Sequence, residues 1–335
     1  MSSFLFINGQ IRAMESRLLD VNRCDRMIGA RSPEEAFRVL VELQYAEYVD
    51  EKATPQDFSR IIDQGLQETK DLLLRGTDNH PGFQFLWWRA DTNNLKRALK
   101  LKLVQKKSEL PEFTNENGFS PLGEISPEDL QMIVFEGKFP ENFPSEYRGI
   151  IEKIPSLYEE KQEFRSVEFA LDQAYFAILQ KIARREASSF LKNWLQLQID
   201  MVNARSLARL LLMREEKIPQ EAFLEGGSYT WEKIRKIENW EQFLEFIKYT
   251  DFSNIRSVIK ENDSDEDKLL KVEKECDRVY KSFLHQAQEG EIDSIQVPLA
   301  YFEKRLQNAR MLKFIMFAKF HGLKPETIYQ TLKQF

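Results

Sequence analysis

A short phrase that returns at a nearly constant interval constrains this chain more than any other feature of its sequence. Asn-Ala-Arg begins at Asn203 and again at Asn308, 105 positions later (308 minus 203). A related phrase, Asn-Leu-Lys-Arg, begins at Asn94, 109 positions before Asn203 (203 minus 94). Repetition with a fixed period predicts similar structural units that pack against their neighbours along the chain. The 335 residues have room for three such units.

Two further recurrences accompany the Asn phrase. A glycine with a Glu a few residues later follows each Asn, at Gly123, Gly227 and Gly322, and the first two are 104 positions apart (227 minus 123). We expect each glycine to end a helix and each Glu to lie in the first turn of the next helix. The segments 33–40 and 240–247 also match, at about twice the interval.

The predicted units are therefore residues 1–122, 123–226 and 227–335. The alternative is that Asn-Ala-Arg recurs by chance in a helix-rich composition. The repeat is the favoured interpretation because the glycine and the Glu recur with the phrase, in the same order.

The fold class follows from composition and periodicity. Only 13 Gly and 12 Pro occur and 30% of residues are charged, which is typical of long solvated helices. Apolar residues repeat at intervals of three and four in three stretches, as one buried helix face requires: Phe164, Val167, Leu171, Ala174, Tyr175, Ile178 and Ile182; Trp194, Leu197, Met201, Ala204, Ala208 and Leu211; Leu299, Phe302, Leu306, Ala309, Leu312, Met316 and Phe320. We predict an all-α protein.

Local signals place breaks and loops. One unbroken helix over 163–214 would be about 75 Å long, so we expect a bend near Ser188 and Ser189 or an extended molecule. Ser32-Pro33-Glu34-Glu35 predicts a capped helix through Phe37, Leu40, Val41 and Leu43. A helix is expected to end at Gly322, and loops are predicted over 75–82, 108–126, 137–144, 215–228 and 261–267.

Charge and cysteine content exclude several classes of function. A net charge of −6 argues against nucleic acid as the main partner. One basic stretch between Asn94 and Lys107 can face acidic protein or lipid headgroups, although a solvated helix face is the favoured interpretation. Cys24 and Cys276 form no disulfide or zinc pattern, which is typical of a reducing cytoplasm, and no signal peptide or transmembrane segment is predicted.

Four stretches carry a resemblance to a known family. They are the N-terminal NGQIRAMESRLL, the Asp-x-x-Asn step in ADTNNLKRALK and in IDMVNARSLARLLL, and the ending PLAYFEKRLQNARMLKFIMFAKFHGLKPETI. Together they resemble the central-stalk socket of rotary ATPases. This is the C subunit of archaeal and bacterial V/A-type enzymes and the d subunit of vacuolar ones. The resemblance spans nearly the whole chain.

The resemblance implies a funnel of three helical units about a pseudo-threefold axis, bound peripherally on the cytoplasmic face of a membrane. The rotor shaft would insert into the funnel, the funnel would sit on the membrane rotor ring, and torque would pass between them for proton or sodium transport. It implies no catalytic residue and no cofactor. Within the complex the chain is expected to be a monomer, because three internal units already supply the symmetry of an oligomer.

The candidate site residues lie in the repeated phrases. Asp91 with Asn94, and Asp200 with Asn203, stand one turn apart on one helix face, where they can cap or bridge neighbouring helices. Interhelical hydrogen bonding at a repeat boundary is favoured over direct contact with the shaft. Asn308 is the third Asn, and Arg305 replaces the Asp before it, so the third unit need not make the same contacts. Arg205 and Arg310 are partner-contact candidates or rim residues whose stems cover apolar surface.

Searches for enzymatic chemistry leave one weak alternative. No P-loop, dinucleotide fingerprint or nucleophile elbow occurs, and Asp78-Asn79-His80 is predicted to form a turn and not a metal site. The acidic run 263–267 can suggest a magnesium-dependent all-α enzyme, but a solvated loop is preferred because no second acidic run faces it. A helical-repeat adaptor for an unrelated protein is the other alternative, since fold does not fix function.

Overall fold

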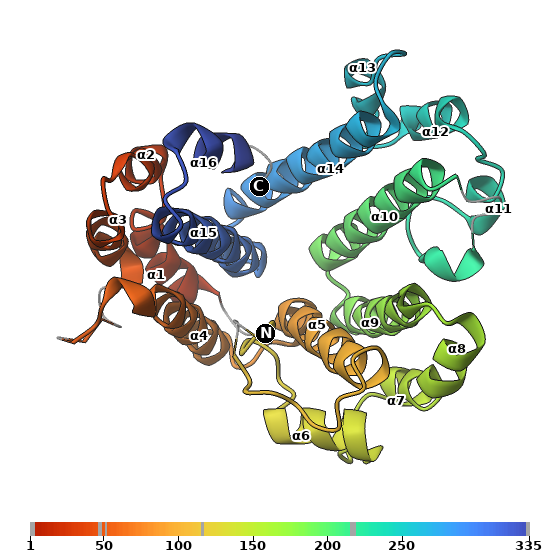
Figure 1. Cartoon of the computed structure of the whole chain (residues 1–335), viewed down its shortest axis with the longest axis horizontal. Helices are drawn as coiled ribbons and strands as arrows, with labels where there is room; N and C mark the ends of the chain where they lie inside the picture. The colour runs from red at the N-terminus through yellow and green to blue at the C-terminus, as the bar shows by residue number, and fades with distance from the viewer. Residues whose placement is uncertain (1–3, 46–48, 51, 115–116, 215–218, 333–335) are drawn as a thin grey trace. The chain divides into compact units, whose positions relative to one another are not determined.

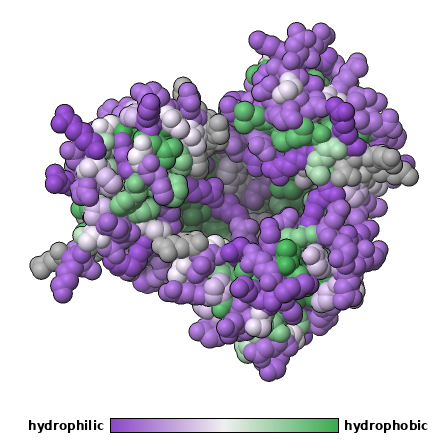
Figure 2. Space-filling model, in the orientation of Figure 1, coloured by the Kyte–Doolittle hydropathy of each residue, from purple (hydrophilic) through white to green (hydrophobic). Residues whose placement is uncertain are grey.

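A computed structural model describes residues 4–45, 49–50, 52–114, 117–214 and 219–332, and every regular element within them is a helix (Figure 1). The all-α prediction is confirmed. On the face drawn in Figure 2, hydrophilic residues predominate and hydrophobic residues occur in small groups, as the high charge content leads one to expect.

Contacts divide the chain into two compact units. Unit 1 combines residues 1–83 with 282–335. Its helices are α1 (Leu5–Glu15), α2 (Val21–Gly29), α3 (Pro33–Leu40), η1 (Val41–Tyr45), η3 (Pro55–Asp57), α4 (Phe58–Gly76), η4 (Pro81–Phe83), α15 (Gln296–Phe320) and α16 (Pro325–Leu332). The beginning and the end of the chain therefore fold together.

Unit 2 is continuous and spans residues 84–281. Its helices are α5 (Gln84–Leu103), α6 (Pro127–Gln131), η5 (Met132–Glu136), α7 (Ser145–Ile151), α8 (Ile154–Lys161), α9 (Phe164–Glu186), α10 (Ser189–Leu212), η6 (Gln220–Ala222), α11 (Trp231–Ile234), α12 (Trp240–Phe246), η7 (Ile247–Tyr249), α13 (Ile255–Val258) and most of α14 (Asp265–Gln288). The division into 1–122, 123–226 and 227–335 stays a prediction.

The order of helices accounts for the period in the sequence. Two short helices and then two long ones recur three times, as α2, α3, α4 and α5; α6, α7, α9 and α10; and α11, α12, α14 and α15, with one additional short helix, α8 or α13, before the long helices of the last two sets. The second long helix begins at residues 84, 189 and 296, which are 105 and 107 positions apart (189 minus 84 and 296 minus 189). We call each set of four a module. The phrase containing Asn lies on the second long helix of each module.

The long helices pack in one recurring way. In unit 2, α9 packs against α5, the second long helix of the preceding module, and α14 is joined to α10 by ion pairs. In unit 1, α4 packs against α15. The predicted apolar stripes face these contacts, because most of their members are buried and the others, such as Phe164 and Leu306, are half-buried.

The predicted break near Ser188 is confirmed. Ala187 ends α9 in the left-handed conformation, with φ of 51°, and the Ser188 hydroxyl then accepts a hydrogen bond from the Leu191 amide to cap α10. At the other predicted cap, Ser32 accepts from the Glu35 amide, while the Glu35 carboxylate accepts from Arg31. The helix that follows ends earlier than predicted, at Leu40, because a kink at Leu43 keeps that side chain in the core.

Three predictions about helix ends need correction. Gly322 ends α15 as predicted, with φ of 63°, but Gly123 and Gly227 lie inside loops and end no helix. The Glu that follows each glycine does lie in the first turn of α6, α11 or α16. Residues 265–267 form the first turn of α14 and not a loop, because acidic side chains favour a helix N-terminus and Ser264 accepts from the Asp267 amide.

The remaining predicted loops are observed where the structure describes them. Thr77 to His80, most of 104–126, and 137–144 contain no α-helix, although residues 115–116 and 215–218 lie outside the described set. The turn at Asp78 and Asn79 is confirmed, since both residues are left-handed and the His80 Nδ1 atom accepts from the Gly82 amide.

The left-handed Ala187 gives a test of the α9–α10 junction. Ala187→Gly is expected to raise the free energy of unfolding by about 0.5–1 kcal/mol, because glycine removes the clash that a Cβ suffers at positive φ. Ala177→Gly, the same change inside α9, is expected to lower it by about 1 kcal/mol. Urea denaturation measures both, and equal losses of stability would contradict the assigned conformation of Ala187.

Candidate functional site

The three repeated Asn residues lie buried on the second long helices, each beside an incoming segment of backbone. Asn94 on α5 is fully buried, and Asn203 on α10 and Asn308 on α15 are nearly so. A loop that crosses a buried helix face needs partners for its own N–H and C=O groups. The three sites, which we call loop clamps, show how the side chains supply them.

The first clamp binds the loop before α6. Asn94 donates from Nδ2 to the Ser120 carbonyl at 2.9 Å and accepts from the Ser120 amide at Oδ1, at 2.8 Å. One turn earlier, the Asp91 carboxylate accepts from the backbone amides of Glu124, at 2.9 Å, and Ile125, at 3.0 Å. Two adjacent side chains therefore satisfy four backbone groups of one loop.

The second clamp repeats this arrangement on α10. Asn203 donates to the Leu224 carbonyl and accepts from the Leu224 amide, both at 2.9 Å. Asp200 accepts from the Ser228 amide at 2.8 Å and from the Ser228 hydroxyl at 2.6 Å. Burial raises the pKa of the Asp200 carboxyl above its usual range, and the hydrogen bonds from Ser228 oppose this shift.

Close approach to the Asp carboxylates explains the two repeated glycines. A Cβ atom built on Gly123 would overlap Asp91 Oδ1, and one built on Gly227 would overlap Asp200 Oδ1. Neither position needs a left-handed backbone, so the requirement is for space alone. The sequence carries no clear signal of this contact, because the Asp-to-Gly interval is 32 positions in the first clamp (123 minus 91) and 27 in the second (227 minus 200).

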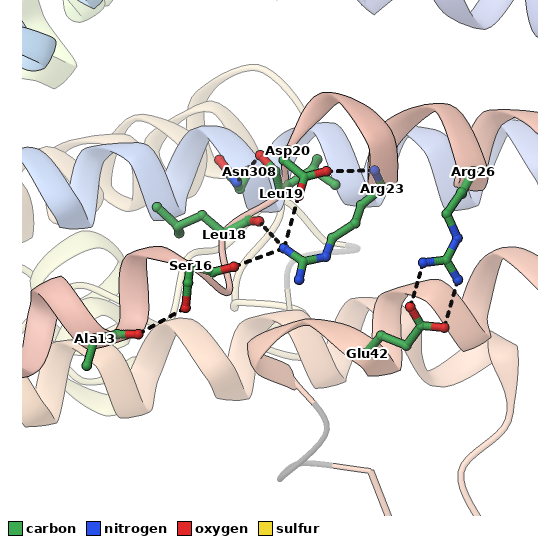
Figure 3. Close-up of polar contacts among 9 residues, drawn as sticks. All are labelled: Ala13, Ser16, Leu18, Leu19, Asp20, Arg23, Arg26, Glu42 and Asn308. Atoms are coloured by element: carbon green, nitrogen blue, oxygen red, sulfur yellow. Dashed lines mark hydrogen bonds and ion pairs between the residues drawn. The ribbon is translucent and has the colours of Figure 1, made fainter.

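The third clamp differs and binds the beginning of the chain. Asn308 lies beside Leu19 (Figure 3). When its amide is oriented to satisfy both groups, Oδ1 accepts from the Leu19 amide and Nδ2 donates to the Lys304 carbonyl, each at 2.8 Å. Arg305, which replaces the Asp, is buried and donates to the Gly65 carbonyl at 3.4 Å, so it does not bind the incoming segment as a carboxylate would.

A different arginine holds that incoming segment. The Arg23 guanidinium donates to the carbonyls of Ser16 and Leu18 at 3.1 and 3.0 Å, and the Asp20 carboxylate caps α2 by accepting from the Arg23 amide (Figure 3). In unit 1 the Arg23 guanidinium therefore binds the incoming segment, a task that the carboxylates of Asp91 and Asp200 perform in unit 2. Sequence reasoning missed Arg23 because it binds the backbone carbonyls of Ser16 and Leu18, and no residue pattern marks a backbone group as a partner.

Ion pairs lie close to the first two clamps. Lys96 on α5 pairs with Asp172 on α9 at 2.5 Å, and Arg205 on α10 pairs with Asp277 on α14 at 2.6 Å. Each cation stands two positions after the clamp Asn. Burial raises the pKa of Asp172, and Lys96 opposes the shift. Arg310, the corresponding residue on α15, is exposed.

Two further features of the structure concern metal ligands and membrane-spanning helices. Among them, no group of three or more His, Cys, Asp or Glu side chains lies close enough together to hold a metal ion. Asp263 accepts from the Lys260 amide and pairs with Lys271, which gives the acidic run a structural explanation. None of the described helices combines the length and apolar composition that a membrane crossing requires.

Comparison with known proteins gives one consistent result. The family model for the ATP synthase (C/AC39) subunit matches residues 7–331. Similar proteins include the A-type ATP synthase C subunits of Thermococcus kodakarensis and Thermococcus onnurineus, each 22% identical over 97% of this chain and over 89% and 88% of their own lengths. The V-type ATP synthase C subunit of Deinococcus radiodurans is 24% identical over 67% of this chain and 64% of its own length.

Alanine substitution tests whether a clamp glycine is required to leave space for the Asp carboxylate. Gly227→Ala is expected to lower the free energy of unfolding by about 1–3 kcal/mol, because the new Cβ displaces Asp200 or the loop. Gly149→Ala is the matched control. It lies in α7 with nothing within 4 Å of its added Cβ, so alanine should stabilise the helix by about 0.5–1 kcal/mol. Thermal unfolding in which both variants shift in the same direction would refute the explanation.

Replacing a clamp Asn with Asp tests whether the amide holds the loop, because the resulting loss of stability should depend on pH. In Asn203→Asp a carboxylate oxygen faces the Leu224 carbonyl, so the folded protein favours the protonated acid and raises its pKa above the unfolded value of about 3.9. The penalty is therefore absent below that value and grows as the pH rises. We expect a loss of about 2–3 kcal/mol at pH 7 and a smaller loss at pH 4.

The control for this test is Asn193→Asp, an exposed change on the same helix. It is expected to leave the stability difference from the wild type nearly independent of pH. Denaturant titrations at the two pH values compare the variants. If Asn203→Asp behaves like Asn193→Asp, the amide does not hold the loop.

Proposed function

This chain belongs to the ATP synthase (C/AC39) subunit family, and from that premise we propose that it is the central-stalk socket of a V/A-type rotary ATPase. As a family member it is a non-catalytic subunit of an ATP synthase complex. In the proposed role it links the rotor shaft to the membrane rotor ring and transmits torque between them. ATP hydrolysis or synthesis, and proton or sodium transport, take place on its partners.

The observation that supports this role most directly is the pair of matched loop clamps. Torque transmission requires a body that deforms little, and stiffness comes from packed seams whose polar groups are all satisfied. Each clamp uses a buried side chain on a long helix to fix the loop that leads into the next module. Helices such as α10, with 24 residues, are about 36 Å long and give such a seam its length.

The proposed shape is a funnel of three modules about a pseudo-threefold axis. The recurring helix order supports it, as does a succession of joined helices: α5 packs against α9, α10 is joined to α14 by ion pairs, and α15 packs against α4. The last pair joins the third module to the first, and the Asn308 clamp does the same. A cyclic succession of this kind suits a socket that surrounds a shaft.

The candidate residues take two proposed roles. Asp91, Asn94, Asp200, Asn203 and Asn308 act at module boundaries, a role that their burial favours over contact with a partner. Arg310 is exposed on α15, and Arg205 is partly exposed on α10. These two arginines are the proposed contacts with the shaft, since a cation at the edge of a seam can pair with an acidic partner residue.

The proposed location is the cytoplasmic face of a membrane, where the chain is held by the rotor ring. The proposal needs no cofactor and no nucleic acid. Its chemistry is confined to packing and ion pairing with the ring and the shaft, in one copy per complex.

Co-purification tests this function. The tagged chain, mixed with detergent-solubilised rotor ring and with purified shaft subunits, is expected to retain both on an affinity column. Retention of neither partner would remove the proposal, and retention of one alone would remove the linking role. Arg310→Glu is expected to weaken retention of the shaft, while Lys192→Glu, an exposed change on α10, should leave it unchanged. Equal retention by both variants would remove the assignment of Arg310.

A further inference from the structure

We propose that a small apolar pocket in unit 2 binds one bulky apolar side chain of an acidic peptide segment from a partner protein. The pocket lies between the C-terminal end of α5, the turn η5, and the α7–α8 junction. Its walls include Leu99, Leu103, Ile133, Phe139 and Ile154, and we call it the Leu99 pocket. This site is separate from the loop clamps and does not depend on the socket function.

The volume of the pocket sets the size of the occupant. It holds about 220 Å³, which suits one aromatic or long aliphatic side chain. This is below the 300–1,000 Å³ that is typical of sites for whole small molecules. Protein interfaces commonly concentrate their binding energy in such an anchor, which fills a pocket and is surrounded by polar contacts.

Local backbone features keep the pocket open. The η5 turn is π-helical, and Lys102 donates to its Val134 carbonyl at 2.6 Å. Gly137 then ends the turn in the left-handed conformation, with φ of 69° and nothing within 4 Å of an added Cβ. Gly137 and Pro155 are both exposed, so the mouth is bordered by residues with little or no side chain to close it.

The charge around the pocket selects an acidic occupant. The three spans that line it, 99–103, 133–139 and 151–155, contain four lysines and two glutamates: Lys100, Lys102, Lys138 and Lys153, with Glu136 and Glu152. Two more lysines, Lys106 and Lys107, follow α5 directly. Glu136 is already paired with Lys138 at 2.8 Å. In a chain whose total charge is −6, this is a local excess of positive charge, and complementary charge steers association.

Two of these lysines are already placed over aromatic rings. Lys106 Nζ lies 5.9 Å from the centroid of the Tyr158 ring, and Lys100 Nζ lies 5.7 Å from that of Phe164. Both side chains are exposed, so their ammonium groups remain open to a carboxylate. The basic stretch found in the sequence thus lies beside an apolar anchor site and is more than a solvated helix face.

A peptide is favoured over a lipid surface by the form of the site. An acyl chain needs a long apolar channel, whereas this pocket has room for a single side chain. A segment with alternating acidic residues and one aromatic anchor satisfies both the lysines and the cavity.

The test uses the intact chain and a defined probe. Fluorescein-labelled Glu-Asp-Glu-Phe-Glu-Asp-Glu is titrated with protein at low salt and followed by fluorescence anisotropy, beside the same peptide with Ser in place of Phe. We expect saturable binding of the Phe peptide, about tenfold weaker binding of the Ser peptide, and weakening of both by added salt. Equal affinity of the two peptides, or no binding, would overturn the proposal.

Variants separate the two parts of the site. Leu103→Trp fills the pocket and is expected to abolish the preference for Phe over Ser, while the double change Lys106→Glu and Lys107→Glu weakens both peptides about tenfold. Lys192→Glu, an exposed charge reversal on α10, is the control for a change away from the pocket and should change neither affinity. Phosphatidylserine vesicles form the last arm. If they bind the wild type and lose binding in the Lys106 and Lys107 variant, while the peptides do not bind, the surface is a lipid site and the proposal fails.

Discussion

The structure depends on one constraint, the need to satisfy backbone polar groups where a loop crosses a buried helix face. Asn94 and Asn203 meet it with one donor and one acceptor each, matched to a single residue of the loop. A side-chain amide donates from its nitrogen and accepts at its oxygen, so it can pair with the C=O and the N–H of one residue at the same time. Once the loop is fixed, the short helix that follows begins at a set position, so each clamp locates the next module.

The long helices supply the apolar part of the same junctions. The first long helix of the second module, α9, packs on α5, and that of the first module, α4, packs on α15. Charged residues at the edge of these seams then add ion pairs such as Arg205 with Asp277. Because the partly exposed pairs are worth little individually, the apolar seams and the satisfied clamps carry most of the stability, and the ion pairs fix the alignment of the helices.

The third clamp shows how a repeat adapts where the chain begins. Its incoming segment, at Leu19, does not follow α15 in the chain, and the carboxylate of the other clamps is replaced by Arg305. Binding of the segment passes to Asn308 and to Arg23, a residue of the N-terminal segment itself. A chain that folds its beginning against its end makes unit 1 discontinuous, which is consistent with the long-range hydrogen bonds from Asn8 to Ile292 and Ser294.

The sequence by itself determined the all-α class, the buried stripes, the break at Ser188 and the period, because apolar spacing, capping residues and repetition are properties of local chain order. It also singled out the Asp and Asn residues. It did not identify their partners Ser120, Leu224 and Leu19. These residues bind through backbone groups, which do not depend on residue type, so the sequence does not mark them. Nor did it explain Gly123 and Gly227, since the missing Cβ makes room for a carboxylate about 30 positions away. Only tertiary structure decided these contacts, and with them the pairing of α15 with the start of the chain, because each depends on which distant surfaces are buried together.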